Sequence, residues 1–269
     1  MKKAAFTWRA AIPFAGLLCA FLMLCYLLKA PQSAKLPPPT GATAVPDNRS
    51  LLLQAARQGD AITVGFLLGQ NTDVNYTNAS GQSALHLAAA NGHTDTVSTL
   101  VRAGADLEKN DVLNRAALAM AAAGGHLETV QYLLNAGADI SNGESTMQSA
   151  LMLASENGHS AVVELLLKSG ASPLPGRNSG SGPAVRALRG NHTVCAMTLL
   201  LNGASPEELD SDGNNLLMLA VAANAPDVVN LLLKKNPQSK LHTNNKGENA
   251  LDWARRQNNT ELIKLLLNN

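Results

Sequence analysis

Four histidines recur at a constant interval along the chain, and their type and spacing raise the question of metal chemistry. His93, His126, His159 and His192 lie 33 residues apart from one to the next. Neutral imidazole is a common ligand for zinc, so a regular array could hold metal ions. Each histidine, however, precedes an apolar stretch that ends in Gly-Ala, which favours one structural position used four times.

The interval itself argues against a shared metal ion. Packed helical units lie about 10 Å apart, whereas zinc binds histidine nitrogens at about 2 Å. Histidines one unit apart therefore cannot bind the same ion. The sequence also contains no paired-cysteine motif, no glycine-rich phosphate loop and no nucleophile elbow. We predict no metal site, no cofactor and no enzymatic activity.

The charge balance argues against nucleic acid as a partner. The chain has 269 residues and a net charge of +1. Residues 1–46 contain five Lys or Arg and no Asp or Glu, so the remainder carries +1 minus 5, or −4. A mildly acidic body with few aromatic residues offers neither a basic face nor a stacking platform.

The elements that position the histidines form a repeat of 33 residues. In the second unit a short apolar run, Ala84 to Ala88, predicts one helix, which Gly92 ends. Thr94 begins a second helix with apolar residues at three- and four-residue spacing. Gly104 ends that helix, and a polar stretch leads to the next unit. Seven such units can be aligned, with one inserted residue before the last; they begin at Asn48, Gly81, Asn114, Met147, Gly180, Gly213 and Gly247.

This pattern resembles the ankyrin-repeat family over about residues 47–269. The motifs that carry the resemblance are Ala-Leu-His-Leu-Ala at 84–88, Asn-Gly-His at 91–93, Gly-Ala-Asp at 104–106 and 137–139, and Val-Val-Glu-Leu-Leu-Leu at 162–167. It implies an all-α solenoid of helix-turn-helix units in which stacked neighbours complete the core. It also implies that the four histidines bond to the backbone of a neighbouring unit, and that His86 is structural.

Several positions depart from the family pattern. Its Thr-Pro-Leu-His motif is nowhere intact, and Asn114 and Met147 replace the glycine of the turn. Ala225 and Asn259 stand where the last two units would carry the histidine. We expect altered turn geometry in the middle units.

The N-terminal segment predicts a membrane anchor. Residues 10–28 are nineteen uncharged, mostly apolar residues, which as a helix would span about 28 Å. The charge distribution places residues 1–9 in the cytoplasm and the body outside. Residues 29–46 are a Pro-rich linker, and 47–269 form the repeat domain. The alternative is a signal peptide cleaved after Ala34, which would leave the body soluble in the periplasm.

The resemblance implies a protein-binding concave face made of the turn tips and the first helices. By position, this face comprises Tyr76, Ser80, Gln82, Asn91, Leu113, Arg115, Met147, Gln148, Glu156, Arg177, Arg189, Asp212 and Asn214. Tyr76 and Arg115 are the expected anchors, because Tyr and Arg are enriched at binding hot spots. Val112, Leu113 and Met147 are apolar at turn tips, which indicates either a contact site or local packing.

Two functions agree with these features. The chain is expected to be a monomer in a bacterial inner membrane, with the repeat domain in the periplasm. There it would bind another protein, as an immunity protein that neutralises a periplasm-acting toxin or lipase effector. The alternative is a scaffold or chaperone-like partner of a periplasmic enzyme, for example one that acts in oxidative stress.

Overall fold

The computed structural model describes residues 47–146, 148–175 and 181–268. Pro46–Asn269 forms one compact unit. The predicted cytoplasmic segment, membrane helix and linker (1–46) lie outside the described residues. Across the described ranges, no helix is both long enough and apolar enough to span a bilayer.

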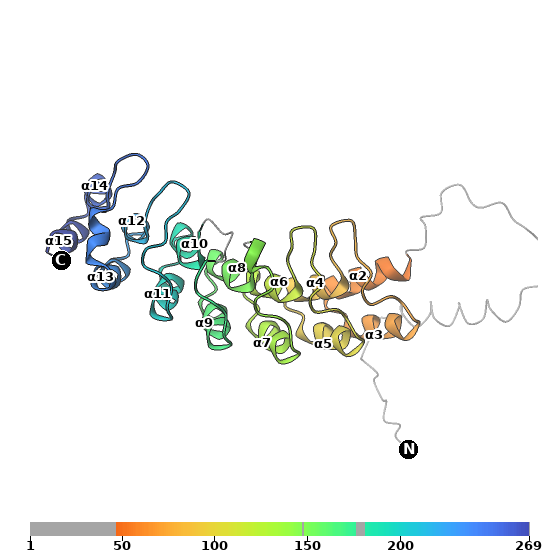
Figure 1. Cartoon of the computed structure of the whole chain (residues 1–269). Helices are drawn as coiled ribbons and strands as arrows, with labels where there is room; N and C mark the ends of the chain where they lie inside the picture. The colour runs from red at the N-terminus through yellow and green to blue at the C-terminus, as the bar shows by residue number, and fades with distance from the viewer. Residues whose placement is uncertain (1–46, 147, 176–180, 269) are drawn as a thin grey trace, which may run out of the picture. The chain divides into compact units, whose positions relative to one another are not determined.

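The described residues form successive pairs of antiparallel helices that stack in chain order (Figure 1). The pairs are α2 (Asn48–Gln58) with α3 (Ala61–Gly69), α4 (Ala84–Ala90) with α5 (Thr94–Arg102), α6 (Ala117–Ala123) with α7 (Leu127–Asn135), α8 (Ala150–Glu156) with α9 (Ser160–Lys168), α10 (Pro183–Arg189) with α11 (Thr193–Leu201), α12 (Leu216–Ala222) with α13 (Pro226–Lys235), and α14 (Ala250–Arg256) with α15 (Thr260–Asn268). Two 3₁₀ helices, η1 (Glu144–Thr146) and η2 (Pro237–Leu241), lie between pairs. The all-helical solenoid predicted from the repeat is confirmed.

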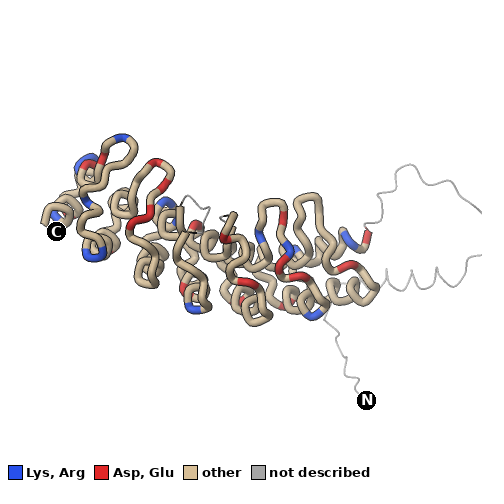
Figure 2. Tube along the Cα trace, viewed as in Figure 1, with Lys and Arg blue, Asp and Glu red and all other residues tan. Residues whose placement is uncertain are grey.

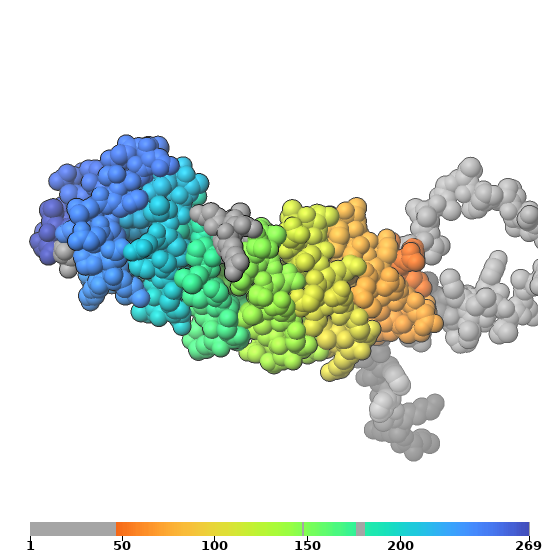
Figure 3. All heavy atoms as spheres, viewed as in Figure 1, coloured from red at the N-terminus to blue at the C-terminus, as the bar shows by residue number. Residues whose placement is uncertain are grey.

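The core runs as columns of identical residues through successive pairs. Leu100, Leu133, Leu166, Leu199 and Leu232 occupy one position of the second helices, and each is at most 1% exposed. The first helices α4, α6, α8, α10 and α12 are mostly buried, because each packs between the first helices of its two neighbours. Stacking thus supplies the apolar contacts that one short helix pair lacks. The space-filling view shows neighbouring pairs packed side by side (Figure 3).

The recurring histidines tie each helix pair to the one before it. The Nε2 atoms of His93, His126 and His159 lie 2.9–3.1 Å from the carbonyl oxygens of Arg57, Ala90 and Ala123 in the preceding pair. The predicted bonds to the backbone of a neighbouring unit are confirmed for these three. The last pair lacks the histidine, and the Gln257 amide donates instead to the Ala222 carbonyl at 3.3 Å.

Each histidine ring also determines which residue the preceding turn can accommodate. Gly59 has φ +78°, and a Cβ atom there would lie 2.6 Å from Nδ1 of His93. Gly92, Gly125 and Gly158 face the next rings in the same way.

Where the next pair has no histidine, the same turn position carries asparagine. Asn191 and Asn224 adopt φ +61° and +51°. They face the pairs that carry Ala225 and Asn259, and asparagine tolerates the left-handed region. Positive φ alone therefore does not require glycine at this turn position. The histidine ring of the next helix pair requires it at Gly59, Gly92, Gly125 and Gly158.

His86 has a related structural role. It is fully buried, and its Nδ1 accepts the backbone N–H of Ser83 at 3.2 Å. Its proton is therefore on Nε2, which donates to the Arg115 carbonyl at 3.0 Å. Burial lowers the pKa of His86 and keeps the ring neutral. The prediction that His86 is structural is confirmed.

Candidate binding surface

The turn tips are built by a common loop of five residues. Asn78, Asp111, Asp210 and Asn244 each accept two backbone N–H groups, from the residues two and four positions later, at 2.8–3.0 Å. The fourth residue of each loop has positive φ. Asn114 supplies it at +58°, close to the +73° of Gly81. Asn114 therefore preserves the turn, contrary to the altered geometry expected from the sequence.

The side chain of the fifth residue of these loops bonds to the side chain of the first. Three of the predicted binding residues, Gln82, Arg115 and Asn214, therefore have partners inside their own loops. The guanidinium of Arg115 contacts the Asp111 carboxylate at 2.7 and 3.0 Å. Gln82 pairs with Asn78 at 3.3 Å. Burial raises the pKa of Asp111, but the hydrogen bonds from Arg115 and Leu113 outweigh this effect and hold that pKa below its usual value. These side chains stiffen the loops that carry the binding face.

Asn214 is also used inside the loops. It is only 6% exposed, and its amide bridges two neighbouring loops: it donates to Asp210 at 3.0 Å and accepts from Asn244 at 2.8 Å. The sequence placed Asn214 on the binding face, but the structure buries it, because its hydrogen-bonding partners come from both sides.

Neighbouring loops are joined through their backbones at both ends of the solenoid. The Val112 N–H donates to the Ser80 carbonyl, and the Asn245 N–H donates to the Asp212 carbonyl, both at 3.1 Å. The side chains of Val112 and Leu113 remain 66% and 54% exposed. These apolar tips therefore stand on a rigid support and face solvent.

The third loop differs from the common form. Here η1 replaces the five-residue turn, and the Gly143 carbonyl accepts the N–H of Gln148 at 3.0 Å. The altered geometry expected for the middle units therefore occurs at this loop. Met147 and Arg177, both predicted binding residues, lie outside the described residues.

Two columns of side chains run along the first helices beside these loops. We call the first the inner column; its members occupy the position of Leu87 in successive units, namely Gln54, Leu87, Met120, Leu153, Arg186, Leu219 and Trp253. We call the second the rim column; its members are Arg57, Ala90, Ala123, Glu156, Arg189, Ala222 and Arg256. Both columns line the same hollows as the loops, and together they form what we call the concave face.

The largest of these hollows lies over α10, α12 and α14. It has a volume of about 480 Å³. Leu219 and Ala222 line it together with Trp253, while Arg189 and Asp212 contribute charges of opposite sign. Arg189 and Asp212 are exposed, and neither side chain forms an ion pair with a described residue. These charges are therefore free to meet a ligand.

Other charges of the concave face are already paired. Arg186 forms an ion pair with Glu156, and Arg256 pairs with Glu248 at 2.5 Å. The bonds from Arg256 and Trp253 lower the pKa of Glu248 to about 2. Glu156 was predicted from the sequence; Arg186 and Trp253 were not. The 33-residue register from Leu87 could have identified them.

The remaining predicted residues divide between structure and surface. Tyr76 is half-buried, and its ring lies 5.4 Å below the Arg49 guanidinium. The Asn91 amide donates to the Leu87 carbonyl at 2.7 Å at the end of α4. Ser80 is exposed at its turn tip. Of these three, only Ser80 has an exposed side chain without such an internal contact.

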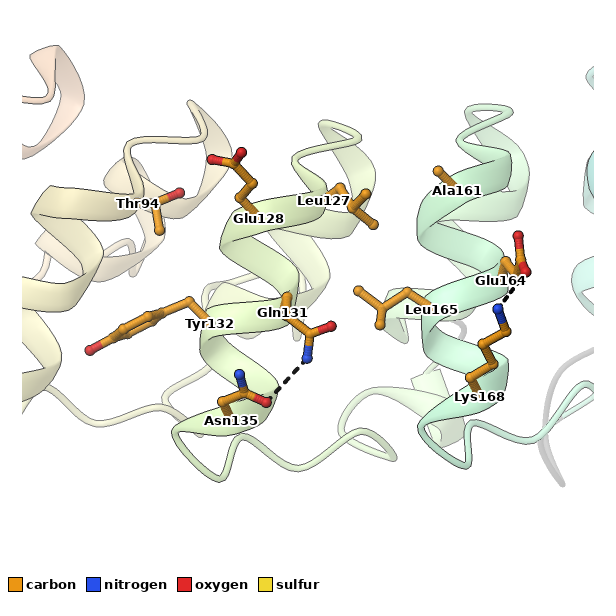
Figure 4. Close-up of a pocket in the computed structure, with 10 residues that line it drawn as sticks. All are labelled: Thr94, Leu127, Glu128, Gln131, Tyr132, Asn135, Ala161, Glu164, Leu165 and Lys168. Carbon is orange, nitrogen blue, oxygen red and sulfur yellow. Dashed lines mark hydrogen bonds and ion pairs between the residues drawn. The ribbon is translucent and has the colours of Figure 1, made fainter.

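A separate groove of about 630 Å³ lies on the outer helices, away from the predicted face (Figure 4). Leu127, Tyr132 and Leu165 line it from α7 and α9. Lys168 and Glu164 pair with each other at 2.6 Å along its edge. This groove was not expected from the sequence, because helices stacked by a regular repeat imply an even outer surface.

Glu208 is a buried acid beside the start of α10. It is 7% exposed, and no described residue forms a hydrogen bond of standard geometry with its carboxylate. Burial raises the pKa of Glu208 to about 7, although the peptide groups of Gly182, Ser205 and Val185 partly lower it. A Cβ atom on Gly182 would lie 2.8 Å from its Cδ, which explains glycine at that helix start.

The next question is whether the described residues could bind a metal ion. The described residues hold no group of three or more His, Cys, Asp or Glu that could bind a metal ion. Lys and Arg are interspersed with Asp and Glu along the repeats (Figure 2). The arrangement suits recognition of a surface.

Comparisons with known proteins agree with this architecture. The family model described as ankyrin repeats (3 copies) matches residues 23–111, 52–143, 108–175 and 183–269. Among the solved structures that are similar is the human ASB11 ankyrin repeat domain, at 26% sequence identity and a TM-score of 0.69; the match covers 81% of this chain and 97% of that one. No curated protein matches the sequence significantly.

Proposed function

The chain belongs to the ankyrin-repeat family, and from this premise we propose that it is a membrane-anchored module that binds a partner protein on its concave face. Ankyrin repeats are protein-interaction modules and are typically without enzymatic activity. We further infer that each described helix pair is one repeat, which makes seven.

One observation carries the proposal. Along the concave face, exposed side chains that form no side-chain bond to a described residue project from hydrogen-bonded loops and packed helices. Leu113 projects from a loop tied to its neighbour, and Arg189 and Asp212 flank the hollow beside Trp253. Preorganised side chains lose little conformational entropy on binding, which favours affinity. Their separation along several repeats suits a protein surface better than a small molecule.

The sequence of residues 1–46 supports the cellular setting. The apolar run at 10–28 would anchor the chain in a bacterial inner membrane, and the charge around it would direct the repeats into the periplasm. A tether, a linker and a recognition surface are the parts that an immunity protein needs. The partner that we propose is a toxin or lipase effector that acts in the periplasm.

The test is crosslinking capture from membranes with the tagged full-length chain. The binding variant combines Leu113→Asp with Arg189→Glu, two exposed positions of the concave face. The control is Lys234→Glu on α13, which makes the same change of charge as Arg189→Glu on an outer helix.

We expect one dominant effector that the binding variant loses and the control retains. Equal capture by both variants would place the binding site elsewhere. Capture of a housekeeping periplasmic enzyme in place of an effector would favour the scaffold function. A toxin-sensitivity assay separates the two, because only an immunity protein protects cells.

A further inference from the structure

Two large apolar side chains are exposed on the outer face of the first helix pair. Ile62 and Phe66 lie one turn apart on α3 and are 87% and 65% exposed. Positions 65 and 69, on either side of Phe66, are exposed glycines. The helix contains no charged residue at all. Its outer face is therefore an open apolar surface with small residues around one aromatic ring.

The repeat register shows that an acidic residue is the commoner choice at the position of Ile62. Ile62 is the second residue of its helix. Four other pairs carry an acidic residue at this position (Asp95, Glu128, Asp227 and Glu261), and the remaining two carry Ala161 and Val194. An acidic side chain there interacts favourably with the helix dipole and with water. An exposed isoleucine does neither. Contact with an apolar environment would remove the exposed areas of Ile62 and Phe66 from water, which is favourable.

The position of α3 in the chain indicates what that environment is. Among the described helices, α3 packs mainly against α2 and α5, so no earlier helix pair covers it. The chain before α2 contains the apolar run 10–28, and only 18 residues (29–46) separate that run from the repeats. A linker of that length spans roughly 56 Å in the polyproline II conformation. The anchor would therefore hold the first repeat close to a bilayer.

We propose that the Ile62–Phe66 face of α3 rests in the interfacial region of the bilayer in which the chain is anchored. This inference depends on the membrane anchoring proposed above. Apolar helix faces with Phe and Leu bury in that region, and tethering raises their effective concentration there. Because α3 carries no Lys or Arg, the contact is apolar and does not depend on anionic lipid.

The test places a fluorescent probe on the face in the full-length chain. Phe66→Trp is compared with Val194→Trp on α11, a position that is 64% exposed on an outer helix of the fifth pair. Both are made with Trp8→Phe, and Trp253 is common to both. The proteins are reconstituted in phosphatidylcholine vesicles with brominated acyl chains, and flotation first measures how much protein is bound.

We expect quenching at position 66 to be about twofold stronger than at position 194, since interfacial helices bury their apolar face roughly 5–10 Å into the boundary between headgroups and acyl chains. High salt should leave the difference unchanged. Adding Ile62→Glu, the residue type found at this position in α7 and α15, should reduce quenching at position 66 to the level of position 194. Both variants change exposed side chains, so thermal melts should coincide.

Three results would overturn the inference, and they are distinguishable. Equal quenching at both positions in floated protein would remove the α3 contact and leave the anchoring intact. Protein that fails to float would exclude the anchoring and the contact together. A position-66 probe shielded from bromine and also from aqueous iodide, with crosslinked dimers, would assign the face to a second copy of the chain.

Discussion

Protonation of Glu208 should make the stability of the repeat unit depend on pH in a way that one substitution removes. The carboxylate is buried, and its pKa is raised from 4.5 to about 7 in the folded chain. Protonation therefore favours the folded state. The stabilisation is fully present below about pH 4.5 and is lost as the pH rises through 7, because the folded state must then hold a buried charge.

The size of the effect follows from the two pKa values. The difference between a pKa of 4.5 in the unfolded chain and about 7 in the folded chain corresponds to about 3 kcal/mol, which is the stability that ionised Glu208 should remove between pH 4.5 and pH 8. Replacing the acid by its neutral isostere, Glu208→Gln, should leave stability near the wild-type value at pH 4.5. At pH 8 the variant should be the more stable protein.

Urea unfolding of residues 46–269, followed by circular dichroism at pH 4.5, 6, 7 and 8, measures this difference. The comparison must be between the two proteins, because His86 acts in the opposite direction: its lowered pKa gives stability that is lost as the pH falls. A wild-type minus variant difference that stays constant with pH would refute the reasoning. So would a variant that is less stable at every pH.

Two further predictions concern the turns. Gly92→Ala should lower the free energy of unfolding by about 2–3 kcal/mol, because a Cβ atom there collides with the His126 ring at a left-handed backbone position. Gly104 has a similar φ, but a Cβ atom there would meet nothing within 4 Å, so Gly104→Ala should cost only about 1 kcal/mol. Thermal melts distinguish them, and equal losses would contradict the role given to the ring. Arg115→Ala should cost about 1–3 kcal/mol, because the buried Asp111 carboxylate keeps its two backbone bonds but loses the guanidinium. Leu113→Asp should leave the melting temperature unchanged. A large loss of stability in the Leu113 variant would show that this side chain packs.

The fold could be predicted from the sequence because the repeat restates it in every unit. A 33-residue period, two helical apolar patterns and glycines at fixed positions determine the helix pairs. The link between turn glycines and the histidines that follow them was also present in the sequence. Only the structure shows the cause of this link, which is that the histidine ring occupies the space that a Cβ atom on the glycine would need.

The binding surface could be predicted only in outline. Position in the repeat located the turn tips. It could not distinguish side chains that are free to meet a ligand from those that bond to other residues of the chain. Arg115 and Asn214 were expected to face a partner, yet their partners are Asp111 in the same loop and Asn244 thirty residues later. The burial of Glu208 likewise depends on the approach of Gly182, which no short-range pattern records.

The bonds that His93, His126 and His159 form between helix pairs point in one direction along the chain. The ring of His93 reaches back 36 residues to Arg57, and His126 and His159 reach back by the same interval. The acceptor of each bond is therefore synthesised before its donor. As the chain emerges N-terminus first, every new helix pair meets a completed platform, so the solenoid can assemble vectorially during synthesis without waiting for its C-terminus.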